Sequence, residues 1–383
     1  MNRKIVILFL LLQPIFFWAQ DNDFHFKHLS TADGLSNSSV IAIEQDRLGN
    51  MWFGTRNGLN KYNGDTFEVF RSDPNDSNSL GNSDILSVLE DSDGYIWVGT
   101  YNGLNKYDPI KHVFKRYSKG PNNNSLLNNV VICSKEMPNG EIWFGTANGI
   151  SIYSKLSDEF TNIPFIENDI ASLPDKNIQR IFLDSSKQIW IATTGGLAKL
   201  VRRRTDDNFR FKQFKKTKTS QNLFIQDVIE IEPNVLALAT KYNGYILFNK
   251  TTERFITDAY PEISSSADVR VLQLANDGNI WLGMAHGVKI ISPENKVYDI
   301  KSNRHNVAGL SQNFIKSIFK DSNGSIWLGT YSGGTNIWNE ANENFINFKN
   351  YAFDNNVVSA IITDGNSNLY FGTEGGNITI LDT

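Results

Sequence analysis

The stretch Asp91–Asp108, which reads DSDGYIWVGTYNGLNKYD, decides the fold. Its polar turn DSDG leads into an apolar strand around Trp97, and Asn102-Gly103 separates this strand from a second one through Leu104 and Tyr107. Asn-Gly between two apolar runs favours a tight hairpin, because a type I′ turn needs positive φ at both central residues. The stretch therefore predicts an antiparallel β-hairpin.

The same frame recurs along the chain at a nearly constant spacing. The central slot of its first strand holds an aromatic residue in every copy but one, which has leucine. These slot residues are Trp52, Trp97, Trp143, Trp190, Leu236, Trp281, Trp327 and Tyr370. A period in the forties built only of short strands is typical of β-propeller blades, each of which buries its apolar faces against the next. We expect the tryptophans to serve this packing.

Two further runs accompany each hairpin. In the second copy, Asp84–Glu90 precedes the hairpin and Val113–Tyr117 follows it, which gives four strands that we name a, b, c and d. The a runs are almost continuously apolar, as suits an innermost strand that is buried on both faces. The d runs, such as Phe67–Phe70 and Phe345–Phe348, are shorter and carry charges, as suits an outer edge. The sequence therefore predicts an all-β propeller of four-stranded antiparallel blades.

The two ends of the chain indicate how the ring closes. Phe24–Leu29 looks like a d strand without a, b or c before it, and the last copy ends after its c strand at Thr379–Leu381. If these halves complete one blade, the ring has no free sheet edge. This interpretation predicts eight blades closed by the N-terminal strand. The alternative is seven blades plus the start of a second ring.

Composition limits the partners of this chain. It has 383 residues, of which 40% are hydrophobic and 12% aromatic, and its net charge is −4. The only basic cluster, Lys199–Arg204 with Lys212–Lys218, is interpreted as a solvated patch on the fourth copy. Nothing in this charge balance supports nucleic acid as a partner.

Residues 1–20 are interpreted as a secretory signal peptide. Arg3 and Lys4 precede an apolar run, Ile5–Trp18, that is short and interrupted by Gln13-Pro14. No later stretch is apolar enough to cross a bilayer. We therefore expect residues 21–383 to form an exported propeller domain without a membrane span.

Motifs for catalysis or metal binding are absent from the sequence. The single cysteine, Cys133, lies in an apolar run, which predicts a buried and inert thiol. The DSDG-type turns lack the glutamate of a calcium loop and are interpreted as tight polar turns. The histidines are not spaced as metal ligands; they are His25, His28, His112, His286 and His305. We expect no cofactor, no metal and no catalytic residue, although a carboxylate pair assembled from distant loops stays open.

The b–c turns are the candidate binding surface. In an antiparallel blade these turns and the d–a linkers emerge on the same face, and there the copies differ. A repeated scaffold that presents non-repeated side chains is typical of a binding surface, and such residues suit a sugar. Drift at exposed turns is the alternative. The candidate residues are Arg56, Asn57, Tyr101, Asn102, Asn148, Lys241, Tyr242, His286, Tyr331 and Glu374.

The repeated frame G-x-I-W-[FVL]-G-T-x-x-G-[LI], together with the opening HLSTADGLSNSSVIAIEQD (His28–Asp46), resembles the two-component regulator propeller repeat. The resemblance extends over Phe24–Leu381. It implies the periplasmic sensor region of a hybrid two-component system, which detects glycan breakdown products and regulates transcription. In that family two rings usually precede an immunoglobulin-like module, a membrane helix and a kinase or DNA-binding output.

These modules do not follow in this sequence, so we expect a non-catalytic sensor propeller, truncated before its output domains, that recognises an oligosaccharide. A homodimer or a signalling partner protein fits this role as well. Two alternatives stay open. One is a propeller enzyme, such as a glycan hydrolase, a lyase or a quinoprotein, with carboxylates or a metal at the mouth of the channel. The other is a scaffold for protein interactions with a flat variable face.

Overall fold

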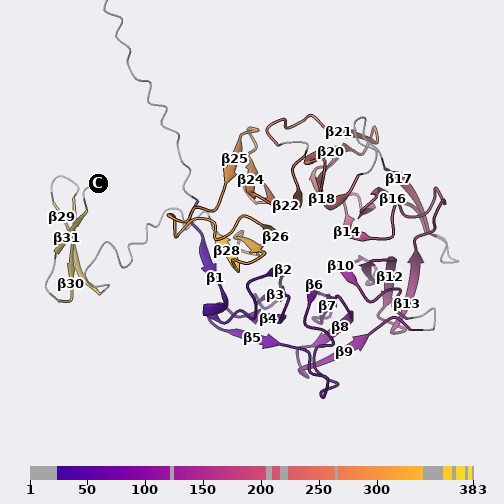
Figure 1. The fold of residues 1–383 in the computed structure, drawn as a ribbon, viewed down its shortest axis with the longest axis horizontal. Coiled ribbons are helices and arrows are strands. Elements are labelled where there is room, and N and C mark those ends of the chain that lie inside the picture. The colour runs from indigo at the N-terminus through magenta and orange to yellow at the C-terminus, as the bar shows by residue number, and fades with distance from the viewer. Residues whose placement is uncertain are drawn as a thin grey trace, which may run out of the picture.

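The computed structural model describes residues 24–120, 125–203, 209–215, 223–263, 266–339, 357–364, 368–375 and 378–381. Within these ranges the chain forms seven antiparallel sheets of four strands and one sheet of three strands. The seven larger sheets stand radially around a central axis (Figure 1). The all-β propeller with four-stranded antiparallel blades is therefore confirmed.

The strands of each blade follow in chain order from the axis outward, except in blade 7. Blade 1 contains β2 (Val40–Gln45), β3 (Met51–Thr55), β4 (Gly58–Tyr62) and β5 (Phe67–Phe70). Blade 2 contains β6 (Ile85–Glu90), β7 (Ile96–Thr100), β8 (Gly103–Asp108) and β9 (Val113–Tyr117). Blade 3 contains β10 (Val131–Glu136), β11 (Ile142–Thr146), β12 (Gly149–Ser154) and β13 (Glu159–Pro164). Blade 4 contains β14 (Ile178–Leu183), β15 (Ile189–Thr193), β16 (Gly196–Arg203) and β17 (Phe209–Phe214).

The remaining blades complete the ring. Blade 5 contains β18 (Ile225–Glu232), β19 (Val235–Thr240), β20 (Tyr245–Asn249) and β21 (Arg254–Ile256). Blade 6 contains β22 (Val269–Leu274), β23 (Ile280–Met284), β24 (Gly287–Ile291) and β25 (Val297–Ile300). Blade 7 contains β26 (Ile315–Lys320), β27 (Ile326–Thr330), β28 (Thr335–Trp338) and the N-terminal β1 (Lys27–Leu29). The separate sheet consists of β29 (Val358–Thr363), β30 (Leu369–Thr373) and β31 (Ile378–Leu381).

Ring closure differs from the first prediction. The N-terminal strand β1 pairs with β28, with Leu29 opposite Thr335, so it supplies the fourth strand of the seventh sheet. The expected partner, Thr379–Leu381, belongs to β31, which pairs with β30 in the separate sheet. The prediction of eight blades is therefore wrong, and the seven blades of the alternative are correct. That the remaining copy starts a second ring stays a prediction. The expected d strand at 345–348 lies outside the described residues.

Packing explains why β1 joins the seventh copy. Main-chain hydrogen bonds do not distinguish one c strand from another, so apolar contacts have to select the partner. Leu29 is buried in one cluster with Trp327 of blade 7 and with Val40 and Phe53 of blade 1. Each of the other junctions between successive blades in the ring has such a cluster, for example Trp52 with Ile85 and Tyr107 between blades 1 and 2. The ring therefore closes at the junction of blades 7 and 1.

Glycines in the b strands mark the closest approach between blades. A Cβ on Gly99 of blade 2 would lie 2.7 Å from the carbonyl oxygen of Val131, and one on Gly329 would lie 2.7 Å from that of Val40. Both distances are too short for a side chain. At Gly372 of β30 the nearest atom is the Cβ of Ala360 in the same sheet, at 3.6 Å. The eighth copy has the blade sequence, but no following blade packs against this glycine.

Aspartates in the a–b turns anchor the tryptophans. Asp91 is buried, and its Oδ1 accepts hydrogen bonds from the backbone N–H groups of Asp93 and Tyr95. Its Oδ2 accepts a hydrogen bond of 2.8 Å from Nε1 of Trp97. Asp46, Asp184 and Asp321 make the same contact with their own tryptophans. The DSDG-type stretches are thus tight polar turns, as predicted, and the buried tryptophans are packing residues.

The ring also has a repeated hydrogen bond between blades. Glu136, at the end of an a strand, accepts a hydrogen bond of 2.7 Å from the N–H of Ser92 in the preceding blade. At the closing junction Gln45 of blade 1 accepts one of 2.7 Å from Ser322 of blade 7. The junction of blades 7 and 1 is therefore built like the internal junctions.

We expect the ring to depend on β1 and to be independent of the eighth copy. A chain that ends at Asn339 should keep its thermal unfolding midpoint, because β29–β31 pair with no strand of the ring. A chain that starts at Ser30 should unfold at a clearly lower temperature, because it exposes the edge of β28 and removes buried Leu29. Differential scanning calorimetry measures both. A drop of equal size after the C-terminal truncation would contradict the seven-bladed ring.

We expect Asp91→Ala to destabilise the ring by about 3 kcal/mol, because it leaves Nε1 of buried Trp97 and two turn N–H groups without an acceptor. Urea unfolding followed by tryptophan fluorescence measures the loss. Asp65→Ala, at an exposed turn position, is the control and should change stability by less than about 0.5 kcal/mol. Equal losses in the two variants would show that the Asp91 contacts contribute nothing specific.

Candidate ligand-binding face and central channel

The b–c turns and the d–a linkers lie on one face of the ring, which we call the turn face. The N–H of Gly103, in the b–c turn of blade 2, donates to the carbonyl oxygen of Asn129 in the linker before blade 3. Gly334 of blade 7 donates in the same way to Ser38 before blade 1. Each of these turns is thus tied to the linker of the next blade, which confirms that turns and linkers share a face.

The predicted site residues fall into two groups. Nine of the ten belong to b–c turns of blades 1, 2, 3, 5, 6 and 7 and therefore lie on the turn face. Glu374 follows β30 in the separate sheet, so the ring does not bring it together with the others. Glu374 was grouped with them on the expectation of an eighth blade in the ring, which the described residues do not form.

Backbone hydrogen bonds hold the turns in one shape. The hydroxyl of Thr100 donates to the carbonyl oxygen of Gly103 at 2.7 Å and accepts from the N–H of Asn102 at 3.0 Å. Thr55 and Thr146 make the same pair of bonds around Asn57 and Asn148. These bonds join the threonine hydroxyl to backbone groups and do not use the asparagine side chains. The residue after each threonine can therefore differ between blades.

Aromatic and cationic side chains gather on blades 5 and 7 of the turn face. The rings of Phe314 and Tyr331 meet edge to face with centroids 5.6 Å apart, and Nζ of Lys316 lies 5.0 Å from the Phe314 centroid. On blade 5, Nζ of Lys241 lies 5.2 Å from the centroid of Tyr242. Tyr242 is 61% exposed and Tyr331 is 49% exposed, so both rings present surface to a ligand.

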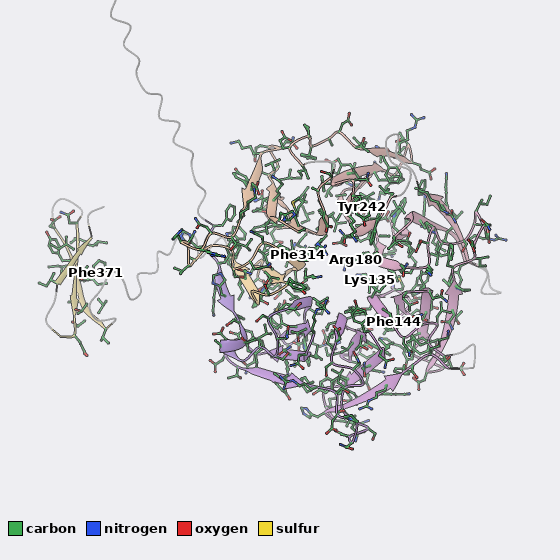
Figure 2. All side chains as sticks on the ribbon, in the orientation of Figure 1. Lys135, Phe144, Arg180, Tyr242, Phe314 and Phe371 are labelled. Atoms are coloured by element: carbon green, nitrogen blue, oxygen red, sulfur yellow. The ribbon has the colours of Figure 1, made fainter. Side chains whose placement is uncertain are left out.

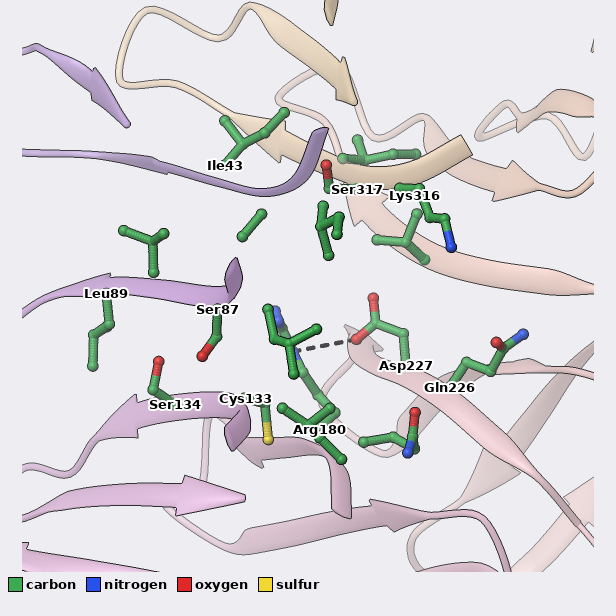
Figure 3. Close-up of a pocket in the computed structure, with 18 of the residues that line it drawn as sticks. Ile43, Ser87, Leu89, Cys133, Ser134, Arg180, Gln226, Asp227, Lys316 and Ser317 are labelled. Carbon is green, nitrogen blue, oxygen red and sulfur yellow. Dashed lines mark ion pairs between the residues drawn. The ribbon is translucent and has the colours of Figure 1, made fainter. Parts of the chain in front are cut away.

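The a strands enclose a central channel with a cavity of about 480 Å³. Its walls carry charges from six blades, and four of them stand deeper in the channel: Glu44 of β2, Lys135 of β10, Arg180 of β14 and Asp227 of β18. Figure 2 shows Lys135 and Arg180 close to the centre of the ring. Nε of Arg180 lies 3.2 Å from Oδ1 of Asp227, as the dashed line in Figure 3 marks.

Burial and neighbouring charges shift the pKa values of the channel residues in different directions. Burial raises the pKa of Glu44 to about 7, although Arg180 and Lys135 attract its carboxylate. Burial and the nearby Arg180 lower the pKa of Lys135. Asp227 raises the pKa of Arg180, whose guanidinium therefore stays charged. Glu44 thus changes charge near neutral pH.

These channel residues were not predicted from the sequence. The a strands were interpreted as alternating or continuous apolar runs, and charges such as Arg180, Asp227 and Arg270 inside these runs were the available signal. A strand buried on both faces excludes unpaired charge. The six charged residues that these strands contribute to the cavity therefore indicate a channel that contains water, and their neighbours across the ring come from blades distant in sequence.

Other expectations are tested by the described residues. Cys133 is buried in the channel wall, and burial raises the pKa of its thiol to about 12, as expected for an inert cysteine. In the basic cluster, Lys199 and Lys212 both pair with Glu253 at the outer strands of blades 4 and 5.

Among the residues with described positions, no group of three metal-binding side chains converges. In the same residues, no helix reaches the length and hydrophobicity that crossing a bilayer requires. The expected signal peptide, residues 1–20, lies outside them.

Comparison with known families gives one match, repeated four times. Residues 34–57, 79–102, 172–195 and 309–332 match the model of the two component regulator propeller. Each matched segment begins in a d–a linker and ends in the following b–c turn. The matched segments belong to blades 1, 2, 4 and 7.

Individual proteins resemble larger parts of the chain. Histidine kinase P4 of Formosa agariphila is 42% identical over 383 residues, which cover 98% of this chain and 28% of that kinase. The chain thus spans less than a third of this relative.

The crystal structure of the extracellular domain of a hybrid two-component system from B. thetaiotaomicron matches with a TM-score of 0.71 at 24% identity, over 94% of this chain and 48% of that one. Virginiamycin B lyase from Staphylococcus aureus matches with a TM-score of 0.62 at 15% identity, over 82% of this chain and 99% of that one. At these identities the two structures establish the fold alone.

We expect Glu44→Gln to gain stability over the natural chain as the pH rises from 5 to 8. The folded pKa of Glu44 lies above its ordinary value, so the folded state loses stability as this carboxyl ionises, between its unfolded pKa and about 7. Urea unfolding at four pH values measures the difference. Glu68→Gln, at an exposed position of β5, is the control. A difference between Glu44→Gln and the natural chain that stays constant with pH would contradict the shifted pKa.

Proposed function

Because the chain belongs to the two-component regulator propeller family, we propose that it is the periplasmic sensor of a two-component system and that it recognises an oligosaccharide on its turn face. Nearly all of this chain, 98%, matches 28% of a histidine kinase. A propeller that forms one part of a longer kinase is suited to be its sensor, and this supports a sensor role. The relative from B. thetaiotaomicron is described as an extracellular domain, which supports a location outside the cytoplasm.

One observation carries the proposal for a ligand. The scaffold of the turns repeats, with the same threonine and glycine bonds, while the side chains on it differ from blade to blade. Exposed Tyr331 and Tyr242 supply ring faces, and polar side chains stand beside them. Aromatic faces bordered by hydrogen-bonding groups suit a pyranose ring, which has apolar C–H faces and polar edges.

The turn face also fits a role without catalysis. The proposal needs only binding there, followed by transfer of the signal to output domains elsewhere in the system. Residues that contact the ligand would come from several blades, so binding of one oligosaccharide bridges turns that are far apart in sequence. Such bridging changes the free energy of the ring and is a physical basis for signalling.

We expect Tyr331→Ala to weaken binding of an oligosaccharide by about tenfold, because it removes an exposed ring face from the turn face. Isothermal titration calorimetry with a panel of neutral and acidic oligosaccharides first identifies a binder and then compares the variants.

Leu48→Ala is the matched control, because Leu48 is 82% exposed in an a–b turn on the opposite face of the ring. It should leave the affinity unchanged. If no oligosaccharide of the panel binds the natural chain, the proposed ligand class is wrong. If Leu48→Ala weakens binding as much as Tyr331→Ala, the site is not on the turn face.

A further inference from the structure

The central channel is cationic although the chain is acidic overall. Six charged side chains line the cavity within the described residues, and four of them are basic. They are Glu44, Lys135, Arg180, Asp227, Arg270 and Lys316. With a pKa of about 7, Glu44 is only partly ionised at neutral pH. The lining thus carries an excess of positive charge, whereas the whole chain has a net charge of −4.

The excess is concentrated at the end of the channel that opens onto the turn face. The second residue of each a strand lines this end. It is apolar in blades 1 to 3 (Ile41, Leu86, Ile132), an amide in blades 4 and 5 (Gln179, Gln226), and a base in blades 6 and 7 (Arg270, Lys316). The mouth therefore has an apolar half and a cationic half. Gln226 and Lys316 appear on the same side of the channel in Figure 3.

Arg270 is held in place and has hydrogen-bonding capacity left. Its guanidinium lies over the ring of Phe314, 4.1 Å from the centroid. One Nη donates to Asp268 at 2.6 Å, and Asp268 also accepts from Gln226 at 2.6 Å. Nε of Arg270 is buried without a hydrogen-bond partner in the structure.

Lys316 stands next to this arginine without an ion-pair partner of its own, and Asp268, which pairs with Arg270, attracts it from a longer distance. Among the described residues no acidic side chain lies within ion-pair distance of its Nζ, whose neighbours are the rings of Phe314 and Tyr331, 5.0 and 5.5 Å from their centroids. Burial, together with the nearby Arg270 and Arg56, lowers the pKa of Lys316. Like charges held together in a partly buried place cost free energy, which a bound anion would recover.

We propose that the mouth of the channel between blades 6 and 7 is an anion subsite that binds the carboxylate or sulfate of an acidic oligosaccharide through Arg270 and Lys316. This inference rests on the proposed function and narrows its ligand class. Tyr331 adjoins the subsite, so a sugar ring stacked on this tyrosine places an anionic substituent within reach of Lys316. The apolar half of the mouth has no side chain that can form a hydrogen bond, so the polar contacts of the ligand are confined to the cationic half.

The test compares oligosaccharides that differ only in charge. Isothermal titration calorimetry is run with hexuronate oligomers, sulfated hexose oligomers and neutral hexose oligomers of equal length. We expect one of the two acidic series to bind at least about tenfold more tightly than the neutral series, and its affinity to fall with added sodium chloride. Which acidic series binds better tells carboxylate from sulfate.

Variants locate the subsite. Lys316→Gln should lower the affinity for the acidic oligomer by about tenfold and leave the affinity for neutral oligomers unchanged, and Lys316→Arg should restore most of the loss. Arg270→Gln should act in the same direction. Lys111→Gln, in the exposed c–d turn on the opposite face, is the control and should have no effect. The thermal midpoint of each variant shows that it is folded.

Each outcome decides the question. Equal affinity for neutral and acidic oligomers, or an undiminished affinity in Lys316→Gln, overturns the anion subsite and leaves the oligosaccharide sensor standing. Absence of binding by every oligomer overturns both. A loss in Lys111→Gln equal to that in Lys316→Gln shows that overall charge attracts the ligand, and it overturns the subsite as well.

Discussion

The close approach of each innermost strand to the second strand of the preceding blade is the constraint on which the ring depends. Gly99 leaves room for the backbone of Val131, and Gly329 leaves the same room for Val40, where a side chain would collide. In blades 4 and 5 the slot holds Ala192 and Ala239, both fully buried, so the approach there accommodates a methyl group. Because each blade packs against two neighbours in this way, its b strand is buried on both faces, and the tryptophan beside the glycine fills the space between the blades. A single copy cannot satisfy this contact alone. The copy that ends in β31 shows the consequence, since large apolar side chains such as Ile361 and Ile378 remain exposed on it.

The same packing separates structural residues from those available for binding. Buried hydrogen bonds, such as those of Asp91 with Trp97 and of Thr100 with Gly103, fix the two ends of each hairpin. The side chains beyond these bonds contribute little to the fold, so they can differ between blades without cost. The innermost strands also turn one row of side chains towards the axis, which brings charges from distant parts of the chain into a single bore. The turn face and the channel mouth therefore adjoin each other at Tyr331 and Lys316.

Much of this architecture could be predicted from the repeat itself. The hairpin, the tryptophan slot and the apolar a runs are local patterns, and each stands where the structure has it. The expected type I′ turn at Asn102-Gly103 is wrong: Gly103 lies opposite Thr100 in the ladder, so Tyr101-Asn102 forms the turn, and only Gly103 of the Asn-Gly pair has a positive φ. The prediction for blade 5 held although Leu236 replaces the tryptophan, because the remaining pattern of the copy still matches the strand period. The candidate turn residues were placed on one face for the same reason: strand direction alone determines on which face a turn emerges. Glu374 was misplaced because this logic does not show whether a copy belongs to the ring.

The number of blades and the contents of the channel were decided by the tertiary structure. Strand β1 could pair with either c strand by main-chain bonds, and only the burial of Leu29 beside Trp327 and Val40 selects the seventh sheet. Likewise, Arg270 and Lys316 are separated by 46 positions and meet only when blades 6 and 7 stand side by side. The sequence by itself determined the blade, because a hairpin and its apolar pattern depend on neighbouring residues. Closure and charge clustering depend on contacts between blades, so they exist only in the assembled ring.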